Sequence, residues 1–133
     1  MILELDLHCG IPIYRQVMDQ IRRQVITGRL APGDRVESVK SLSARLKVNP
    51  MTISKAYGYL VEERVLERRR GIGLFVKPIR KETRERLRAR YLREALEKAA
   101  VLAVQMQIPM EEACRILAEE YRRHAPGGRR GEP

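Results

Sequence analysis

Pro50 is the residue that most constrains how this chain can fold. The residue before a proline is disfavoured in the helical conformation, whereas proline itself fits the first position of a helix. One helix must therefore end before Asn49, and Asn49 can cap a second helix that starts at Pro50. Ser38 can cap the first of these helices. Apolar residues recur at helical spacing in both segments, at Val39, Leu42 and Leu46 and then at Ile53, Ala56, Tyr57, Leu60 and Val61.

A short helix, a tight turn and a longer helix together predict a helix-turn-helix. Another helix is expected before it, over Pro12–Thr27, with Pro12 at its first position and Gly28 at its end. After it, Glu67–Arg70 and Leu74–Lys77 flank a glycine-rich turn and predict a β-hairpin. A hairpin directly after a helix-turn-helix is typical of a winged helix. In that fold one helix enters the major groove of DNA, and the hairpin, or wing, touches the neighbouring backbone or minor groove.

The chain changes character near Lys81, where a charged and apolar pattern predicts a helix of about two dozen residues. Pro109 interrupts this pattern, so a second helix follows and a helical hairpin results. Residues 125–133 have nothing to bury and predict a disordered tail. The expected fold class is mainly α, with a winged helix-turn-helix domain over residues 1–78 and a two-helix dimerisation appendage over 79–124.

Each helix of this appendage carries an apolar stripe, and the appendage is too small to form a sizeable core alone. We therefore predict a homodimer in which two copies pack as a helical bundle across a two-fold axis. The alternative is that the hairpin folds back onto its own winged helix. Met106, Met110 and Tyr121 can line a pocket for a small-molecule effector, or they can be plain core. The predicted dimer contacts are Leu87, Tyr91, Leu96, Leu102, Met106 and Leu117.

The charge balance points to an anionic partner. The chain has 27 Lys and Arg against 17 Asp and Glu, a formal net charge of +10. Residues 1–77 hold 14 of these basic residues against 8 acidic ones, and residues 78–133 hold 13 against 9, so both parts are basic. There is no apolar run of about 18 residues, and the first residues lack the basic start of a signal peptide. We expect a cytoplasmic protein without membrane association.

Patterns for catalysis or metal binding are not evident in the sequence. His8 and His124 lie near its two ends, and no Ser-His-Asp or His-Cys pattern of any specificity occurs. Cys9 and Cys114 lie far apart, so we expect reduced cysteines, with Cys114 a small core residue. Gly71-Ile72-Gly73 lacks the helix that follows a phosphate-binding loop. We predict no enzymatic activity, no metal site and no cofactor.

Candidate DNA contacts lie in three places. Side chains at the start of the helix from Pro50, or off its apolar stripe, would point into a groove: Asn49, Met51, Thr52, Ser54 and Lys55. Lys40, on the outward side of the preceding helix, can reach a phosphate or a guanine. Arg68-Arg69-Arg70 is either a solvated strand edge or a DNA contact. Its place beside a glycine turn favours DNA contact by Arg69, Arg70 and Gly71, because glycine lets the backbone approach DNA closely.

Four stretches, in this order, resemble the GntR family of bacterial transcription regulators. Ile11 to Val17 with Gly28 to Asp34 resembles the first helix of that family and its following turn. Ser38 to Ser43 resembles the second helix, Val48 to Tyr57 the recognition helix, and Arg70 to Val76 the wing. Only a two-helix appendage follows the wing, as in the YtrA subfamily. The resemblance implies a homodimer joined through these helices and DNA contacts at Lys40, Asn49, Met51, Thr52, Ser54, Lys55, Arg70 and Gly71.

Three departures from the family pattern affect this expectation. Glu37-Ser38 stands where the family usually has Pro-Ser, and Lys40 stands where it usually has Arg. Lysine lacks the planar fork that arginine offers to guanine, so the base preference can differ from that of relatives. The frequent arginine of the recognition helix is replaced by Ser54 or Lys55. Glu37 adds a negative charge near the expected DNA, which the sequence alone does not explain.

The expected function is that of a sequence-specific DNA-binding repressor, acting as a homodimer on an inverted-repeat operator. The resemblance implies that its target can be its own operon, often one that encodes an ABC transporter. Two alternatives remain open. A non-specific architectural nucleic-acid-binding protein would bind DNA without sequence preference, and its affinity would fall steeply as the salt concentration rises. A protein-interaction adaptor would use the apolar stripe of residues 87–106 and show no DNA affinity at moderate salt.

Overall fold

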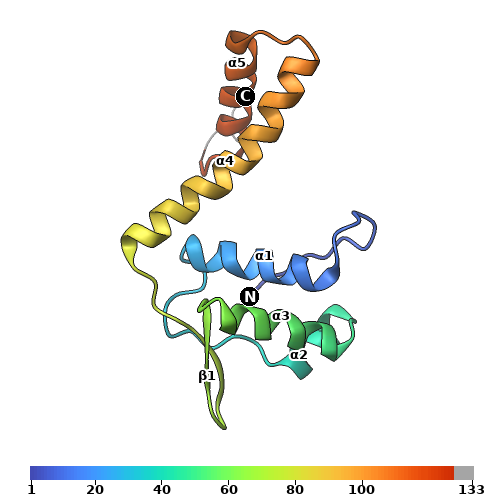
Figure 1. The fold of residues 1–133 in the computed structure, drawn as a ribbon, viewed down its shortest axis with the longest axis vertical. Helices are drawn as coiled ribbons and strands as arrows, with labels where there is room; N and C mark the ends of the chain where they lie inside the picture. The colour runs from blue at the N-terminus through green and yellow to red at the C-terminus, as the bar shows by residue number, and fades with distance from the viewer. Residues whose placement is uncertain (128–133) are drawn as a thin grey trace. The chain divides into compact units, whose positions relative to one another are not determined.

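The computed structural model describes residues 1–127, so residues 128–133 of the predicted tail lie outside the described residues. The chain divides into two compact units, residues 1–88 and 89–133, and each is described by itself. The expectation of a mainly helical chain with one small antiparallel sheet is confirmed (Figure 1). In chain order the elements are α1 (Ile13–Ile26), α2 (Val39–Leu46), α3 (Pro50–Glu62), β1 (Leu66–Arg69), β2 (Gly73–Val76), α4 (Lys81–Gln105) and α5 (Met110–His124).

The predicted helix caps define the helix-turn-helix. The Ser38 hydroxyl accepts a hydrogen bond from the Ser41 N–H at 3.1 Å, and the Asn49 side chain accepts one from the Met51 N–H at 2.8 Å. Between them Lys47 ends α2 in the left-handed region, with φ of 58°. The prediction for Pro12 is wrong by one position. Pro12 has an extended ψ of 145° and is the N-cap of α1, which begins at Ile13.

The core of the first unit lies where α1 and α2 pack on α3. One face of α3 is fully covered, because Ile53, Ala56 and Leu60 have no exposed surface and Tyr57 is 2% exposed. The Tyr57 hydroxyl finds its partner inside this packing, where it donates to the Glu37 carbonyl at 2.6 Å. The opposite face of α3 is therefore the one available to a ligand.

The wing begins one residue earlier on each strand than the sequence predicts. Its register pairs Leu66 with Val76 and Arg69 with Gly73, which leaves Arg70 in the turn. Residues 33–36 pair with the other side of β2, a contact that the sequence did not predict. The Val36 N–H donates to the Leu74 carbonyl at 2.9 Å, and the Val76 N–H donates to Asp34 at 2.8 Å. The wing is thereby joined to the segment that leads into α2.

Residues 1–6 form an extended segment that runs along α1. We call this segment the strap. Its odd positions face the core, with Leu3 6% exposed and Met1 and Leu5 packed beside it. Its backbone is bound by the side chains of Gln16, Gln20 and Gln24 of α1. The strap adds an apolar layer to the first unit that the sequence analysis did not predict.

The second unit contains most of α4 and all of α5. Gln107, with φ of 58°, lies in the turn where the chain reverses between them (Figure 1). Within residues 1–127, no residue of α4 or α5 is buried. Cys114 is exposed, so its predicted place in a core is wrong for the single chain, because the hairpin has no third helix to cover it. No helix in the described part of the chain is long and apolar enough to cross a membrane.

Candidate nucleic-acid interface

The start of α3 presents one methionine and several short polar side chains outward. Met51 is 77% exposed and Ser54 is exposed, while Thr52 is half-buried beside them. Asn49 uses its amide oxygen in the helix cap, so its amide NH₂ group is the part left to donate to a ligand. These four predicted contact residues lie together at the first turn and a half of the helix. The side chains of Asn49, Thr52 and Ser54 are short enough for the helix to approach the floor of a groove closely.

Lys55 has a different setting from the other residues predicted on this helix. Its ammonium lies 4.1 Å above the centre of the Tyr14 ring of α1, and Tyr14 in turn lies 5.7 Å from the Tyr59 ring. A cation over an aromatic face is attracted by the ring electrons. This contact fixes the ammonium at the flank of α3 that faces α1. A charge in that place suits a phosphate better than a base edge.

Arginines surround the wing. Arg69 lies over the Phe75 ring, with 4.1 Å between the guanidinium carbon and the ring centre, and forms an ion pair with Glu67 at 3.0 Å. Arg70 is exposed in the turn next to Gly71, whose φ of 75° favours glycine. Arg69 is thus held by two partners, whereas Arg70 at the tip extends into solvent. The predicted wing contacts differ in how firmly the fold positions them.

Arg35 is a candidate contact that the sequence analysis missed. Its guanidinium packs so closely on Gly73 that a Cβ there would lie 2.9 Å from the Arg35 Nε. Gly73 also has a φ of 147°, so a larger residue would be strained in both respects. The alternation of Arg35 with the buried Val36, after a Pro-Gly turn, was the signal that a third extended segment places this side chain beside the wing.

An open recess of about 340 Å³ lies between the segment that leads into α2 and the wing. It brings together residues far apart in the sequence, because residues 33–36 pair with β2. Four arginines contribute to its wall, and the N-terminus of α2 adds its partial positive charge. Lys40 is exposed on the first turn of α2. The lining residues are Arg35, Val36, Glu37, Ser38, Val39, Tyr57, Arg68, Arg69, Arg70, Gly71, Ile72, Gly73 and Leu74.

Glu37 is the exception in this basic surface, and the structure explains how it is tolerated. Both of its carboxylate oxygens accept hydrogen bonds from Arg45, at 2.7 and 3.3 Å, and one also accepts from the Ser41 hydroxyl at 2.7 Å. Arg45 and Ser41 hold the pKa of the Glu37 carboxyl below its usual range. Burial raises the pKa of the Tyr57 hydroxyl, so this neighbour stays a neutral donor. The negative charge is neutralised within the protein.

The described residues contain no group of three or more His, Cys, Asp or Glu side chains that could hold a metal ion. The four arginines that line the recess are groups suited to an anionic ligand.

Comparison with known proteins agrees with this geometry. Residues 13–76 match the profile of the family described as bacterial regulatory proteins, gntR family. The chain is 29% identical over 109 residues to the HTH-type transcriptional repressor YtrA of Bacillus subtilis, covering 82% of this chain and 84% of the relative. It is 37% identical over 86 residues to the uncharacterized HTH-type transcriptional regulator YhcF of the same organism, covering 65% and 70%. These relatives are regulators of transcription and not enzymes.

The fold is similar to that of a GntR family transcriptional regulator from Listeria monocytogenes. The two structures have a TM-score of 0.74 and 27% sequence identity, over 85% of this chain and 98% of the other. The similarity therefore extends past the wing into the two-helix appendage.

Acidification should remove the contribution of Glu37 to stability. Because the folded chain lowers the pKa of Glu37, that contribution is complete above the ordinary carboxyl pKa of 4.5 and is lost as the pH falls below it. We expect Glu37→Ala to reduce the free energy of unfolding in urea at pH 7, and to reduce it by less at about pH 3. Glu62→Ala, at the exposed end of α3, is the control. An equal loss for Glu37→Ala at both pH values would contradict the ion pair.

Proposed function

Because this chain belongs to the gntR family of bacterial regulatory proteins, it is a DNA-binding transcriptional regulator, and we propose that it represses transcription as a homodimer on an inverted-repeat operator. The observation that carries this proposal is the outward face of α3. Met51 and Ser54 are exposed there and Thr52 is half-buried beside them, while Ile53, Ala56 and Leu60 on the opposite face have no exposed surface. A helix exposed in this way can enter the major groove.

Each winged helix would read one half-site. Asn49, Met51, Thr52 and Ser54 would face base edges, and Lys40, Lys55, Arg69, Arg70 and Gly71 would contact phosphates or the adjacent groove. Arg35 joins this second group because it lines the same recess as the wing arginines. The cations supply affinity that is independent of sequence, and the short side chains of α3 supply the preference for one sequence.

The proposed dimer would form through α4 and α5. Among the predicted contacts, Leu102, Met106 and Leu117 are at least half exposed in the single chain, and Leu96 is 37% exposed. Leu87 and Tyr91 are half-buried. Val101, Val104 and Ile116 add to the uncovered apolar surface. Apolar surface on this scale marks an interaction site, and a two-fold partner presents the same surface in return.

The regulated genes and the effector are proposals that rest on the family alone. The target we propose is an operon for an ABC transporter that includes the gene of this regulator. Met106, Met110 and Tyr121 are exposed in the single chain, so an effector pocket among them would need the second copy to close it. The proposed division at residue 78 puts all of α4 in the dimerisation part.

The proposed function requires a preference for one DNA sequence. We expect the protein to bind the DNA upstream of its own gene at least about a thousandfold more tightly than a scrambled duplex. Fluorescence anisotropy at two salt concentrations measures this. Equal, strongly salt-dependent binding to both duplexes would favour an architectural protein, and no binding to either at moderate salt would favour an adaptor.

Lys55→Ala should weaken operator binding and leave the dimer intact. Since a lysine on a phosphate carries no sequence information, the loss should be similar for native and scrambled duplexes, and the salt slope should fall by about one unit. Thr52→Ala, at the groove-facing start of α3, is the matched comparison and should reduce the preference for the native duplex. Unchanged affinity in Lys55→Ala would remove this residue from the interface.

Leu102→Glu should convert the dimer into a monomer, because it places a charge within an apolar helix–helix interface. Sedimentation velocity measures the change, with Arg93→Glu as a control that introduces the same residue elsewhere on α4. The monomer should lose most of its affinity for a complete inverted repeat and retain its affinity for a single half-site. A Leu102→Glu variant that still sediments as a dimer would exclude this face.

A further inference from the structure

The strap is bound to α1 by a ladder of three glutamines. Gln16 accepts from the Asp6 N–H and donates to the Asp6 carbonyl, both at 2.8 Å. Gln20 makes the same two bonds with Glu4, and Gln24 donates to the Ile2 carbonyl at 2.6 Å. Four helical residues rise about 6 Å, and two extended residues span about 6.6 Å. Every fourth residue of α1 therefore meets every second residue of the strap.

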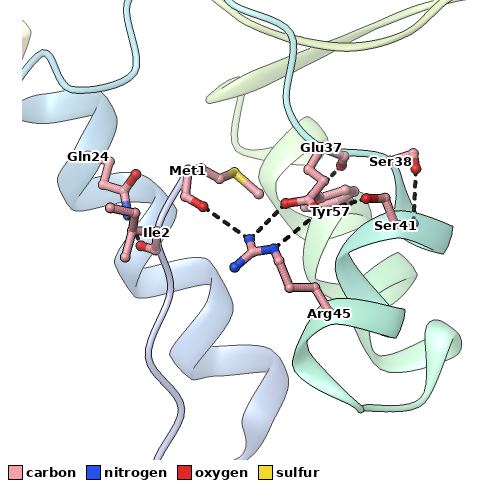
Figure 2. A network of polar contacts seen from close by, with 8 residues as sticks. All are labelled: Met1, Ile2, Gln24, Glu37, Ser38, Ser41, Arg45 and Tyr57. Carbon is pink, nitrogen blue, oxygen red and sulfur yellow. Dashed lines mark hydrogen bonds and ion pairs between the residues drawn. The ribbon is translucent and has the colours of Figure 1, made fainter.

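Arg45 of α2 connects the strap to the helix-turn-helix. Figure 2 shows its guanidinium between the Met1 carbonyl and the Glu37 carboxylate, with Nη2 donating to them at 3.0 and 2.7 Å. Arg45 therefore links the Met1 carbonyl to the Glu37 carboxylate, although Met1 and Arg45 are 44 positions apart in the sequence. The strap thus contacts α1 at Ile2, Glu4 and Asp6. It contacts α2 through Met1.

Glu37 links Arg45 to the residues of the candidate interface. Its carboxylate is bound by Arg45 and Ser41, while its backbone carbonyl accepts from the Tyr57 hydroxyl of α3 (Figure 2). It directly precedes Ser38, the cap of α2, and it lines the recess beside the wing. A shift of Glu37 would therefore move the start of α2 relative to both α3 and the wing.

We propose that Glu37 and Arg45 are positioning residues for DNA binding, which the strap and its glutamine ladder hold in place. They fix α2 against α3 so that Lys40 and the start of α3 face one DNA surface together. This inference rests on the proposed function, because it assigns these residues to the same interface. Under this proposal Glu37 favours the binding of DNA, although both carry negative charge.

The sign of the effect separates this proposal from simple electrostatics. If Glu37 only repelled phosphate, Glu37→Ala and Glu37→Gln would both bind DNA more tightly than the parent chain. If it positions α2, Glu37→Ala should bind about tenfold more weakly, because Arg45 loses its carboxylate partner. Glu37→Gln should recover part of the loss, since its amide oxygen can still accept from Arg45. Glu62→Ala removes the same charge from the exposed end of α3 and is the control.

The strap is tested in the full chain with Gln20→Ala, which removes two hydrogen bonds to Glu4, and Gln24→Ala, which removes one to Ile2. Both side chains lie outside the candidate DNA surface. We expect weaker DNA binding in both, with the larger loss in Gln20→Ala, while circular dichroism shows folded protein at the assay temperature. Relative to the parent chain, amide hydrogen exchange in the absence of DNA should accelerate in α2, and it should accelerate less in α4.

Tighter binding by Glu37→Ala, or unchanged α2 exchange in Gln20→Ala, would overturn the proposal. A parent chain that binds no duplex would overturn the proposed function instead. In that case the exchange rates of α2 still report whether the strap holds this helix.

Discussion

The packing of one face of α3 against α1 and α2 determines what the rest of the first unit can do. Ile53, Ala56 and Leu60 have no exposed surface in this core, and Tyr57 has almost none. A buried tyrosine must place its hydroxyl on a partner, and the Glu37 carbonyl supplies one. That bond sets the entrance to α2, whose orientation in turn decides how the recess opens beside the wing. Apolar burial thus selects the outward face of α3.

Local chemistry explains why the helix-turn-helix could be predicted from the sequence. The Ser38 and Asn49 caps and the start of α3 at Pro50 depend only on residues within one turn, and all three are found in the structure. The order of helices and strands follows from periodicity in the same way. Pro12 and the hairpin strands are each displaced by one residue, since proline and glycine patterns locate a boundary less finely than a side-chain cap does.

The missed features all depend on contacts between residues eight or more positions apart in the sequence. Nothing near Glu37 predicts that Arg45 neutralises it, although both residues were visible in the sequence. Arg35 reaches the wing only because residues 33–36 pair with β2. The strap required two signals to be combined, the alternation of Met1, Leu3 and Leu5 and the fourfold spacing of glutamines on α1. The outward residues of α3 could therefore be predicted from the sequence, whereas the packing of α2, the wing and residues 1–6 around that helix could not.

The pairing of β2 on both sides affects how this protein behaves at high concentration. Unpaired strand edges recruit strands from other molecules, and a wing must remain exposed to reach DNA. Here β2 lies between β1 and residues 33–36, so its own edges are occupied. The outer strand β1 is only four residues long and includes Glu67, Arg68 and Arg69. Its short length and the cost of removing these charged side chains from water protect that edge, so the wing can extend into solvent without promoting aggregation.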